Sequence, residues 1–180
     1  MSTAHESDPQ QPANTTDELI EMIPALRIYA RNLMRGTDEV DDLVQETLMK
    51  ALANVSSFQP GTNLRAWLFT IMRNSFLTRV VKRTREPVGN ADCVSGTLVS
   101  FPKHDAHIAG NRVMAAIERL PPQYREALIL VFLMGESYQD VAEICGCAIG
   151  TVKSRINRAR HMVIEDLGAT RLDDLIAANY

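Results

Sequence analysis

Apolar residues recur along this chain with the period of an α-helix, and no segment alternates apolar and polar residues over the length of a β-strand. The widest apolar stripe lies between about residues 39 and 54, and its members are Val40, Leu43, Val44, Thr47, Leu48, Ala51 and Leu52. Spacing of this kind is typical of a helix that packs one face on a core. The same period returns in residues 20–33, 64–82, 111–120, 121–135, 138–145 and 149–166. We therefore predict an all-α protein.

One long interruption divides the helical segments into two groups. Residues 86–106 contain two prolines and two glycines and have no sustained period. Because proline and glycine interrupt helices, we interpret this segment as a flexible linker. It would join two helical domains, at residues 17–85 and 107–167. Residues 1–16 are polar and are expected to be disordered, and residues 168–180 are expected to form a C-terminal tail.

Residues 138–156 have the spacing of a helix-turn-helix motif. Gly146 can adopt the left-handed conformation that ends the first helix, and Ala142 is small where the second helix would cross it. The apolar positions of the second helix share one side and are Ile149, Val152, Ile156, Ala159 and Val163. Its other side carries hydroxyl, amide and cationic groups. That combination suits the major groove of DNA, where arginine or lysine pairs with guanine, asparagine with adenine, and surplus cations with phosphate.

Charge is distributed unevenly along the chain, although the formal net charge is only −3. Residues 65–85 carry six cations and no acid, and residues 153–160 carry four cations and no acid. Residues 38–46, in contrast, carry five acids and no base. A basic surface attracts nucleic acid and an acidic surface repels it. We therefore expect two surfaces that face DNA and one that docks on a basic protein partner.

The sequence contains no pattern of a catalytic or cofactor site, such as G-x-S-x-G, a P-loop or H-E-x-x-H. We therefore expect neither enzymatic activity nor a cofactor. Cys93, His104 and His107 lack a fourth ligand and a standard zinc spacing, so we expect no metal site. An odd number of cysteines, three, favours a reducing cytoplasm. The longest apolar run, residues 127–134, is far shorter than the roughly 20 residues that span a bilayer, so no membrane insertion is expected.

Four motifs follow one another along the chain: DEVDDLVQETLMKAL, FQPGTNLRAWLFTIMRNSFLTRVVKR, LPPQYREALIL and SYQDVAEICGCAIGTVKSRINRAR. Together they resemble the extracytoplasmic-function (group IV) sigma factors of the sigma-70 family, in the family's own order and over about residues 17–165. The first motif resembles the helix that binds the RNA polymerase clamp, and the second resembles the region that reads and melts the −10 element. The last two resemble the DNA-binding domain. The resemblance implies a σ2 domain followed by a σ4 domain.

Such a protein would initiate transcription by binding core RNA polymerase, at its clamp and flap, and directing it to promoter DNA. The expected contacts with the core are Asp41, Asp42, Gln45 and Glu46. The expected readers of the double-stranded −35 element are Lys153, Ser154, Asn157 and Arg158, with Thr151, Arg155 and Arg160 on phosphates. The expected contacts with the single-stranded −10 element are Phe58, Asn74, Arg79, Lys82 and Arg83. Trp67 falls on the apolar side of its helix and is expected in the core.

The segments FPKH and ERLPPQYREALILV resemble the general-stress branch of the family, which implies a stress-responsive protein held inactive by a small anti-sigma factor. Two alternatives stay open: a decoy that sequesters an anti-sigma factor without reading promoters, and a plain helix-turn-helix repressor, which leaves the first domain unexplained. The sequence departs from the family at Ala148, where serine or proline often opens the recognition helix. It also departs at Cys145 and Cys147, which we interpret as small buried hydrophobes.

Overall fold

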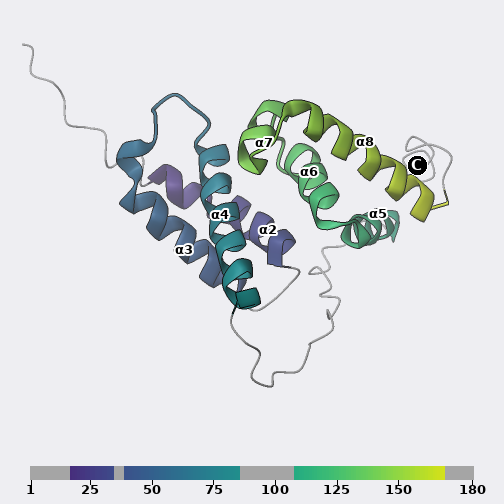
Figure 1. Cartoon of the computed structure of the whole chain (residues 1–180), viewed down its shortest axis with the longest axis horizontal. Helices are drawn as coiled ribbons and strands as arrows, with labels where there is room; N and C mark the ends of the chain where they lie inside the picture. The colour runs from purple at the N-terminus through teal and green to yellow at the C-terminus, as the bar shows by residue number, and fades with distance from the viewer. Residues whose placement is uncertain (1–16, 35–38, 86–107, 169–180) are drawn as a thin grey trace, which may run out of the picture.

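The structure, a computed structural model, describes residues 17–34, 39–85 and 108–168, and all regular secondary structure in these ranges is helical (Figure 1). The elements are α2 (Ile23–Met34), α3 (Val40–Ala53), the short 3-10 helix η1 (Val55–Ser57), α4 (Leu64–Arg85), α5 (Ile108–Arg119), α6 (Pro122–Phe132), α7 (Tyr138–Cys145) and α8 (Ile149–Asp166). Residues 17–21 form a further helical turn before α2. The all-α prediction is confirmed. The predicted linker at 86–106 and most of the two predicted tails lie outside the described residues.

The N-terminal helices α2, α3 and α4 pack on one another around apolar side chains. Leu26, Leu43 and Phe69, one from each helix, are fully buried. The apolar stripe predicted for α3 is only partly correct, because Leu52 at its end is 51% exposed. Thr47, which the pattern placed in this stripe, is buried and donates its hydroxyl to the carbonyl of Leu43 at 2.7 Å, so its polar group is satisfied within the helix.

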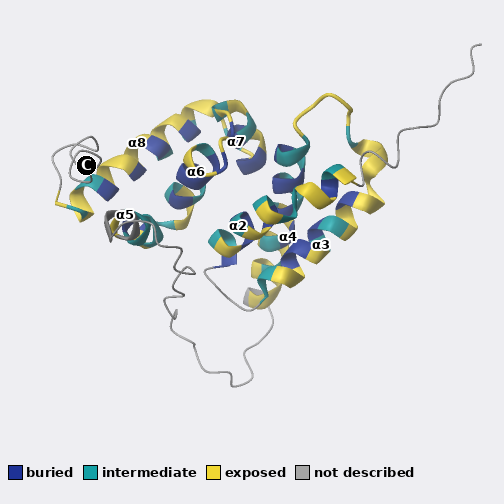
Figure 2. Cartoon of the chain, turned by 180° about the vertical axis from the view of Figure 1, so that it is seen from behind, coloured by how far each residue is buried: buried dark blue, intermediate teal, exposed yellow. Residues whose placement is uncertain are grey.

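The C-terminal helices α5 to α8 form the second group, in which α8 packs on α5, α6 and α7. The buried face of α8 consists of Val152, Ile156, Ala159 and Val163, as the helical spacing predicts. Figure 2 shows this division, with buried residues on the inner side of α8 and exposed residues on the outer side. The prediction was wrong for Ile149, which is 41% exposed because this first residue of α8 borders an open pocket beside α7.

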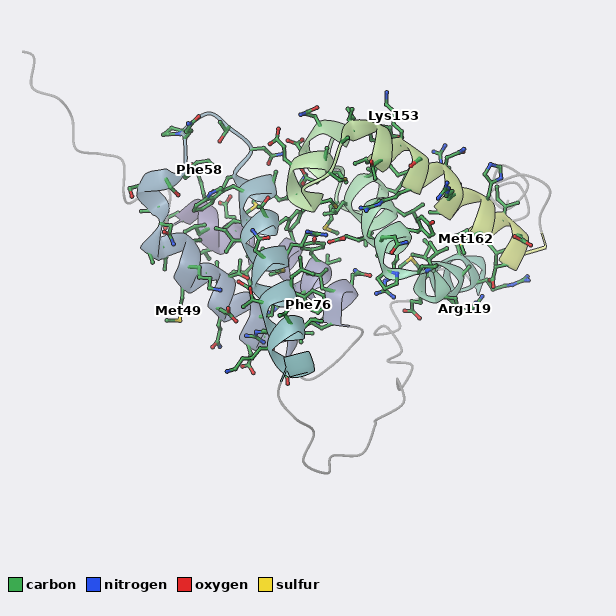
Figure 3. All side chains as sticks on the ribbon, in the orientation of Figure 1. Met49, Phe58, Phe76, Arg119, Lys153 and Met162 are labelled. Atoms are coloured by element: carbon green, nitrogen blue, oxygen red, sulfur yellow. The ribbon has the colours of Figure 1, made fainter. Side chains whose placement is uncertain are left out.

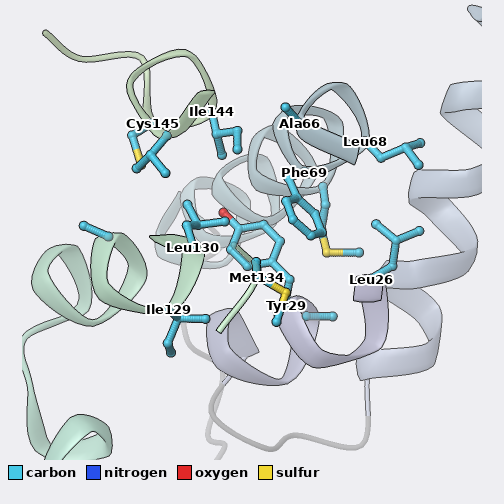
Figure 4. Packing of buried hydrophobic residues seen from close by; sticks show 14 of the residues in the cluster. Leu26, Tyr29, Ala66, Leu68, Phe69, Ile129, Leu130, Met134, Ile144 and Cys145 are labelled. Atoms are coloured by element: carbon cyan, nitrogen blue, oxygen red, sulfur yellow. The ribbon is translucent and has the colours of Figure 1, made fainter. Parts of the chain in front are cut away.

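The two groups of helices are not separate in this structure: α4 packs against α7, and α2 packs against α6. We call this contact the interdomain interface. One core cluster continues across it and includes Tyr29 and Phe69 from the N-terminal helices and Leu130 and Ile144 from the C-terminal helices (Figure 4). The rings of Tyr29 and Phe69 lie with their centroids 4.8 Å apart. The interface therefore has an apolar centre, in which Tyr29 is completely buried.

The starts and ends of the helices mostly follow the sequence. Asn63 caps α4 by accepting a hydrogen bond from the backbone N–H of Ala66 at 3.1 Å. Gly146 ends α7 in the left-handed conformation, at φ 60° and ψ 42°, as predicted. Ala148 at the start of α8 offers no side-chain cap, again as predicted. For α3 the cap position is Glu39, which makes no capping hydrogen bond. The sequence offers Thr37 or Asp38 as a cap for this helix and Gly36 as an end for the one before it, but all three lie outside the described residues.

Candidate nucleic-acid and protein interfaces

The outer face of α8 presents all four residues that the sequence assigns to base recognition. Lys153, Ser154, Asn157 and Arg158 are all exposed, and the packing of the opposite face holds the helix against α6 and α7. Figure 3 shows Lys153 pointing away from the protein body. A left-handed glycine and a capping box lie at the two ends of α7, because the Ser137 hydroxyl accepts a hydrogen bond from the backbone N–H of Asp140 at 3.1 Å. Both ends of α7 are thus fixed, and the turn at Gly146 that leads into α8 has a defined backbone conformation.

Three cations of α8, one of them Arg158, also make contacts within the protein. Arg155 is half-buried and directs one guanidinium nitrogen to the sulfur of Cys147 at 3.9 Å. The guanidinium of Arg160 lies over the ring of Phe132, 4.9 Å from its centroid. Arg158 donates to the hydroxyl of Tyr124 at 3.4 Å, and this cation lowers the pKa of Tyr124. Arg155 and Arg160 are therefore held by the fold at the edges of the exposed face, which is where phosphate contacts are expected.

The acidic start of α3 lies on the surface, but its acids differ in their surroundings. Asp42 and Gln45 are exposed, and Asp41 accepts a hydrogen bond from Arg27 at 3.0 Å at an exposed site. Glu46 lies deeper and accepts from Lys50 at 2.6 Å and from Arg79 at 2.8 Å. The hydrogen bond from Lys50, together with Arg79, lowers the pKa of Glu46 although partial burial opposes this. Glu46 thus also ties α3 to α4.

The cations at the end of α4 contact this same acidic helix, which the sequence did not indicate. Arg79 also donates to the backbone carbonyl of Asp42 at 3.3 Å, and Arg83 donates to the carboxylate of Glu39 at 2.6 Å. The sequence pattern treated the acidic and basic segments as separate surfaces. In the fold they lie side by side, so acidic residues at the start of α3 fix the positions of Arg79 and Arg83.

A cavity of about 320 Å³ opens between the end of α3 and the middle of α4. Its lining is mainly polar and comprises Lys50, Asn54, Ser57, Trp67, Ile71, Asn74, Ser75 and Thr78. Phe58 lies beside it and packs on Trp67, with ring centroids 5.3 Å apart (Figure 3). Asn74 is therefore placed at the cavity and Phe58 next to it. The prediction that Trp67 lies in the core is only half correct, because its ring is half-buried and also lines this cavity.

Two large apolar side chains on α3 are exposed, and sequence reasoning did not include them in any site. Met49 is 72% exposed and Leu52 is 51% exposed, both on the helix that carries the acidic start (Figure 3). A methionine and a leucine that are open to water on one helix favour contact with another macromolecule. The signal in the sequence was available for Met49, which lies off the apolar stripe, but not for Leu52, which the stripe placed in the core.

Two other cations of α4 are engaged at the interdomain interface. Arg73 donates to Glu126 of α6 at 2.9 Å, and Arg65 pairs with Glu136, which lies between α6 and α7. Glu126 also accepts a hydrogen bond from the hydroxyl of Tyr29 at 2.8 Å. Burial, reinforced by the carboxylate of Glu126, raises the pKa of Tyr29 well above its usual value. No sequence pattern singled out Glu126 or Glu136.

Burial raises the pKa of the Cys145 thiol to about 12, so this residue is an inert part of the core, as we interpreted it from the sequence. Cys147 is half-buried. Within the described residues, no group of histidine, cysteine, aspartate and glutamate side chains is arranged to hold a metal ion. Cys93, His104 and most of the segment around them lie outside the described residues, as does His107. Among the described helices, none combines the length and the apolar character that crossing a bilayer requires.

Comparison with known protein families finds two matches in this chain. Residues 19–86 match the family described as sigma-70 region 2, and residues 110–162 match the family described as sigma-70, region 4. The first match contains α2 to α4 with the cavity, and the second contains α6, α7 and the exposed face of α8. The motif order read from the sequence is therefore the order of the matched regions.

Curated relatives and solved structures agree with these matches. The chain is 52% identical over 144 residues to the ECF RNA polymerase sigma factor EcfG of Rhodopseudomonas palustris, and this match covers 80% of each protein. It is 34% identical to the ECF RNA polymerase sigma factor SigC of Mycobacterium tuberculosis, over 70% of this chain and 69% of that protein. Among solved structures, it is similar to the sigma factor RpoE of Bartonella quintana in complex with the anti-sigma factor NepR. That similarity has 44% identity and a TM-score of 0.77, and it covers 88% of this chain and 99% of the other.

Proposed function

Because this chain belongs to the extracytoplasmic-function sigma factors of the sigma-70 family, we propose a role in transcription initiation for each of its exposed surfaces. The protein is a sigma factor, which brings core RNA polymerase to promoters and is a transcription initiation factor rather than an enzyme. In this proposal α8 binds the −35 element, α4 and the adjoining cavity bind the −10 element, and α3 binds core polymerase. We place its action in the cytoplasm, where polymerase and chromosomal DNA are found.

The observation that carries this assignment is the exposed face of α8. Lys153, Ser154, Asn157 and Arg158 form a face without a single acid, on a helix whose other face is buried. Arginine and asparagine are the side chains that best distinguish guanine and adenine in the major groove. A decoy that only sequesters an inhibitor needs no such face, and the decoy alternative is not favoured.

The cavity beside Phe58 supports the assignment of the −10 element. Its volume of about 320 Å³ leaves room for an unstacked base, and its lining offers one aromatic face in Trp67 together with amide and hydroxyl groups. Proteins that hold a flipped base use this combination of stacking and hydrogen bonds. We assign to Asn74 the hydrogen bonds to the base edge. Lys82, Arg79 and Arg83 lie further along α4 and are assigned to the phosphates of the strand.

We assign core binding to the exposed side of α3. Asp42 and Gln45 supply polar contacts, with Asp41 at their edge, and the exposed Met49 and Leu52 extend the surface with apolar area. Interfaces of this kind combine an apolar centre with charges that orient the partner. Glu46 is part of the surface but also holds α4, so its replacement would disturb both helices.

The family and the relative from Bartonella quintana support control by an anti-sigma factor. That relative, a sigma factor, was solved in complex with the anti-sigma factor NepR, and its similarity to this chain covers both groups of helices. We propose that a small anti-sigma protein likewise binds this chain and that its release accompanies a stress response.

The test is run-off transcription by purified core polymerase with this protein on a promoter library. We expect initiation at promoters that share a −35 and a −10 motif. Arg158→Ala should reduce initiation from these promoters by about tenfold to a hundredfold, the cost of losing one specific base contact. Glu165→Ala, an exposed change on the same helix, is the matched control and should have little effect. No initiation with the wild-type protein, or unchanged promoter selectivity in Arg158→Ala, would contradict the assignment.

A further inference from the structure

The interdomain interface contains two carboxylates that bind α4. Glu126 accepts from Arg73 at 2.9 Å and from the Tyr29 hydroxyl at 2.8 Å. Glu136 accepts from the amide of Asn63 at 2.9 Å and from the guanidinium of Arg65. Both acids come from the C-terminal helices or the turn between them, and the four donors come from the N-terminal helices or, for Asn63, from the loop before α4. Arg125 of α6 adds one contact in the opposite sense, because its guanidinium donates to the backbone carbonyl of Asn32 at 3.1 Å. Each of the two interface acids is thus bound by donors of the first group.

The two carboxylates are shielded from water, and their cations are shielded to different extents. The side chain of Glu136 is 1% exposed and that of Glu126 is 12% exposed, whereas Arg73 is 19% exposed and Arg65 is 37% exposed. A buried carboxylate is stable only when a cation and hydrogen bonds compensate its lost hydration. When the two groups of helices separate, water can replace those partners on every one of the charges. The charges therefore define the closed arrangement closely and also permit the helices to separate without leaving unpaired buried groups.

The cations that these acids occupy belong to the basic segment of α4. Arg65 and Arg73 are two of the six cations in residues 65–85. Asn63 ends the loop that begins at Phe58, and it is held at both ends of its amide: the oxygen caps α4 and the nitrogen donates to Glu136. The closed arrangement therefore neutralises two cations of α4, one of them largely buried, and holds the end of the loop next to the cavity.

We propose that the interdomain interface is an autoinhibitory latch, in which Glu126 and Glu136 compete with the phosphates of the −10 strand for Arg73, Arg65 and the end of the Phe58 loop. The free protein is closed, and its α4 is partly neutralised by its own second domain. Opening the interface separates both cations from their acids and releases the loop. The inference rests on the proposed function of α4, and the experiment below separates the two.

Glutamine at both positions removes the charge of the latch and keeps the shape of the side chains. In the closed arrangement of Glu126→Gln/Glu136→Gln, the shielded Arg73 loses its anionic partner, whereas in the open arrangement it is hydrated. The equilibrium should therefore shift to the open form. Glu143→Gln/Glu165→Gln is the matched control, because it removes two charges from exposed positions of the same domain. This control measures how much the affinity for DNA rises merely because two negative charges have been removed.

Two quantities are measured on the free full-length proteins: the radius of gyration by small-angle X-ray scattering, and the affinity for a fluorescent single-stranded oligonucleotide. We expect the latch variant to have a larger radius of gyration than wild type and to bind the oligonucleotide about tenfold more tightly or better, because the competent fraction limits the apparent affinity. We expect the control to match wild type in size and to gain much less affinity. Circular dichroism and a cooperative thermal transition verify that each variant is folded.

A latch variant that stays as compact as wild type and binds no better than the control overturns the proposal. So does a variant that expands without gaining affinity, because the interface would then mask nothing that DNA uses. Transcription by holoenzyme made with saturating protein reports separately on the proposed function. It should be nearly the same for wild type and the latch variant, since the latch acts on the free protein, and its absence in wild type would refute the sigma-factor role without bearing on compaction.

Discussion

Replacing Gly146 by alanine tests whether the turn between α7 and α8 requires glycine for its backbone conformation. Gly146 has φ 60° and ψ 42°, and a Cβ built on it would meet no atom within 4 Å. The cost of Gly146→Ala is therefore conformational and not steric, and for a left-handed residue it is about 1–2 kcal/mol. For a chain of this size, each kcal/mol lowers the melting temperature by about 2–4 °C. We expect a destabilised but correctly folded protein.

Gly150 offers a matched control four residues further on. It lies in the first turn of α8, its backbone is not left-handed, and an added Cβ would again meet nothing within 4 Å. Alanine is the better helix former by up to about 1 kcal/mol, so Gly150→Ala should stabilise the protein or leave it unchanged. Urea unfolding of the free proteins, followed by circular dichroism, gives both values. A Gly146→Ala variant as stable as wild type, or equal destabilisation by both changes, would refute the conformational argument.

Two further predictions concern titratable groups. Lys50 and Arg79 lower the pKa of Glu46 below 4.5, so the stability from these contacts is complete above about that pH and is lost as the pH falls through the lowered pKa. The free energy of unfolding, measured by urea titration, should therefore fall less for Glu46→Gln than for wild type between about pH 5 and pH 3. An equal fall in the two proteins would contradict this. Because the pKa of Cys145 is raised to about 12, iodoacetamide at about pH 8 should leave Cys145 unmodified until the protein is denatured; rapid labelling of the Cys145 peptide in the native protein, by mass spectrometry, would be the opposite result.

The helices and the exposed face of α8 could be predicted from the sequence because both are local properties. Helical spacing placed Val152 and Ile156 on the buried face of α8, and the same spacing left Lys153 and Asn157 exposed. The left-handed Gly146 followed from its place between two periodic segments. The error at Leu52 arose because periodicity marks a face as apolar but does not reveal whether another element covers its last turn.

The contacts between distant segments could not be predicted in this way. In the sequence, Glu126 and Glu136 are single acids in an apolar helix and a turn, and nothing near them indicates Arg73 or Arg65 as partners. The same holds for the pairs of α3 with α4, where the sequence showed two blocks of opposite charge but not that they lie side by side. Which charges pair depends on how the helices pack in three dimensions, and the helical period of a sequence does not specify that packing.

The sharing of Glu46 between two surfaces has a consequence for how such a protein can change over evolutionary time. Any substitution there alters the surface that we assign to polymerase and, through Arg79, the position of the helix that we assign to the promoter. A mutation at Glu46 would thus have to preserve both surfaces at once, whereas a mutation of the exposed Asp42 side chain would change mainly the surface of α3. Efforts to build sigma factors that recognise a different polymerase while keeping their promoters should therefore vary Asp42 and Met49 and leave Glu46 unchanged.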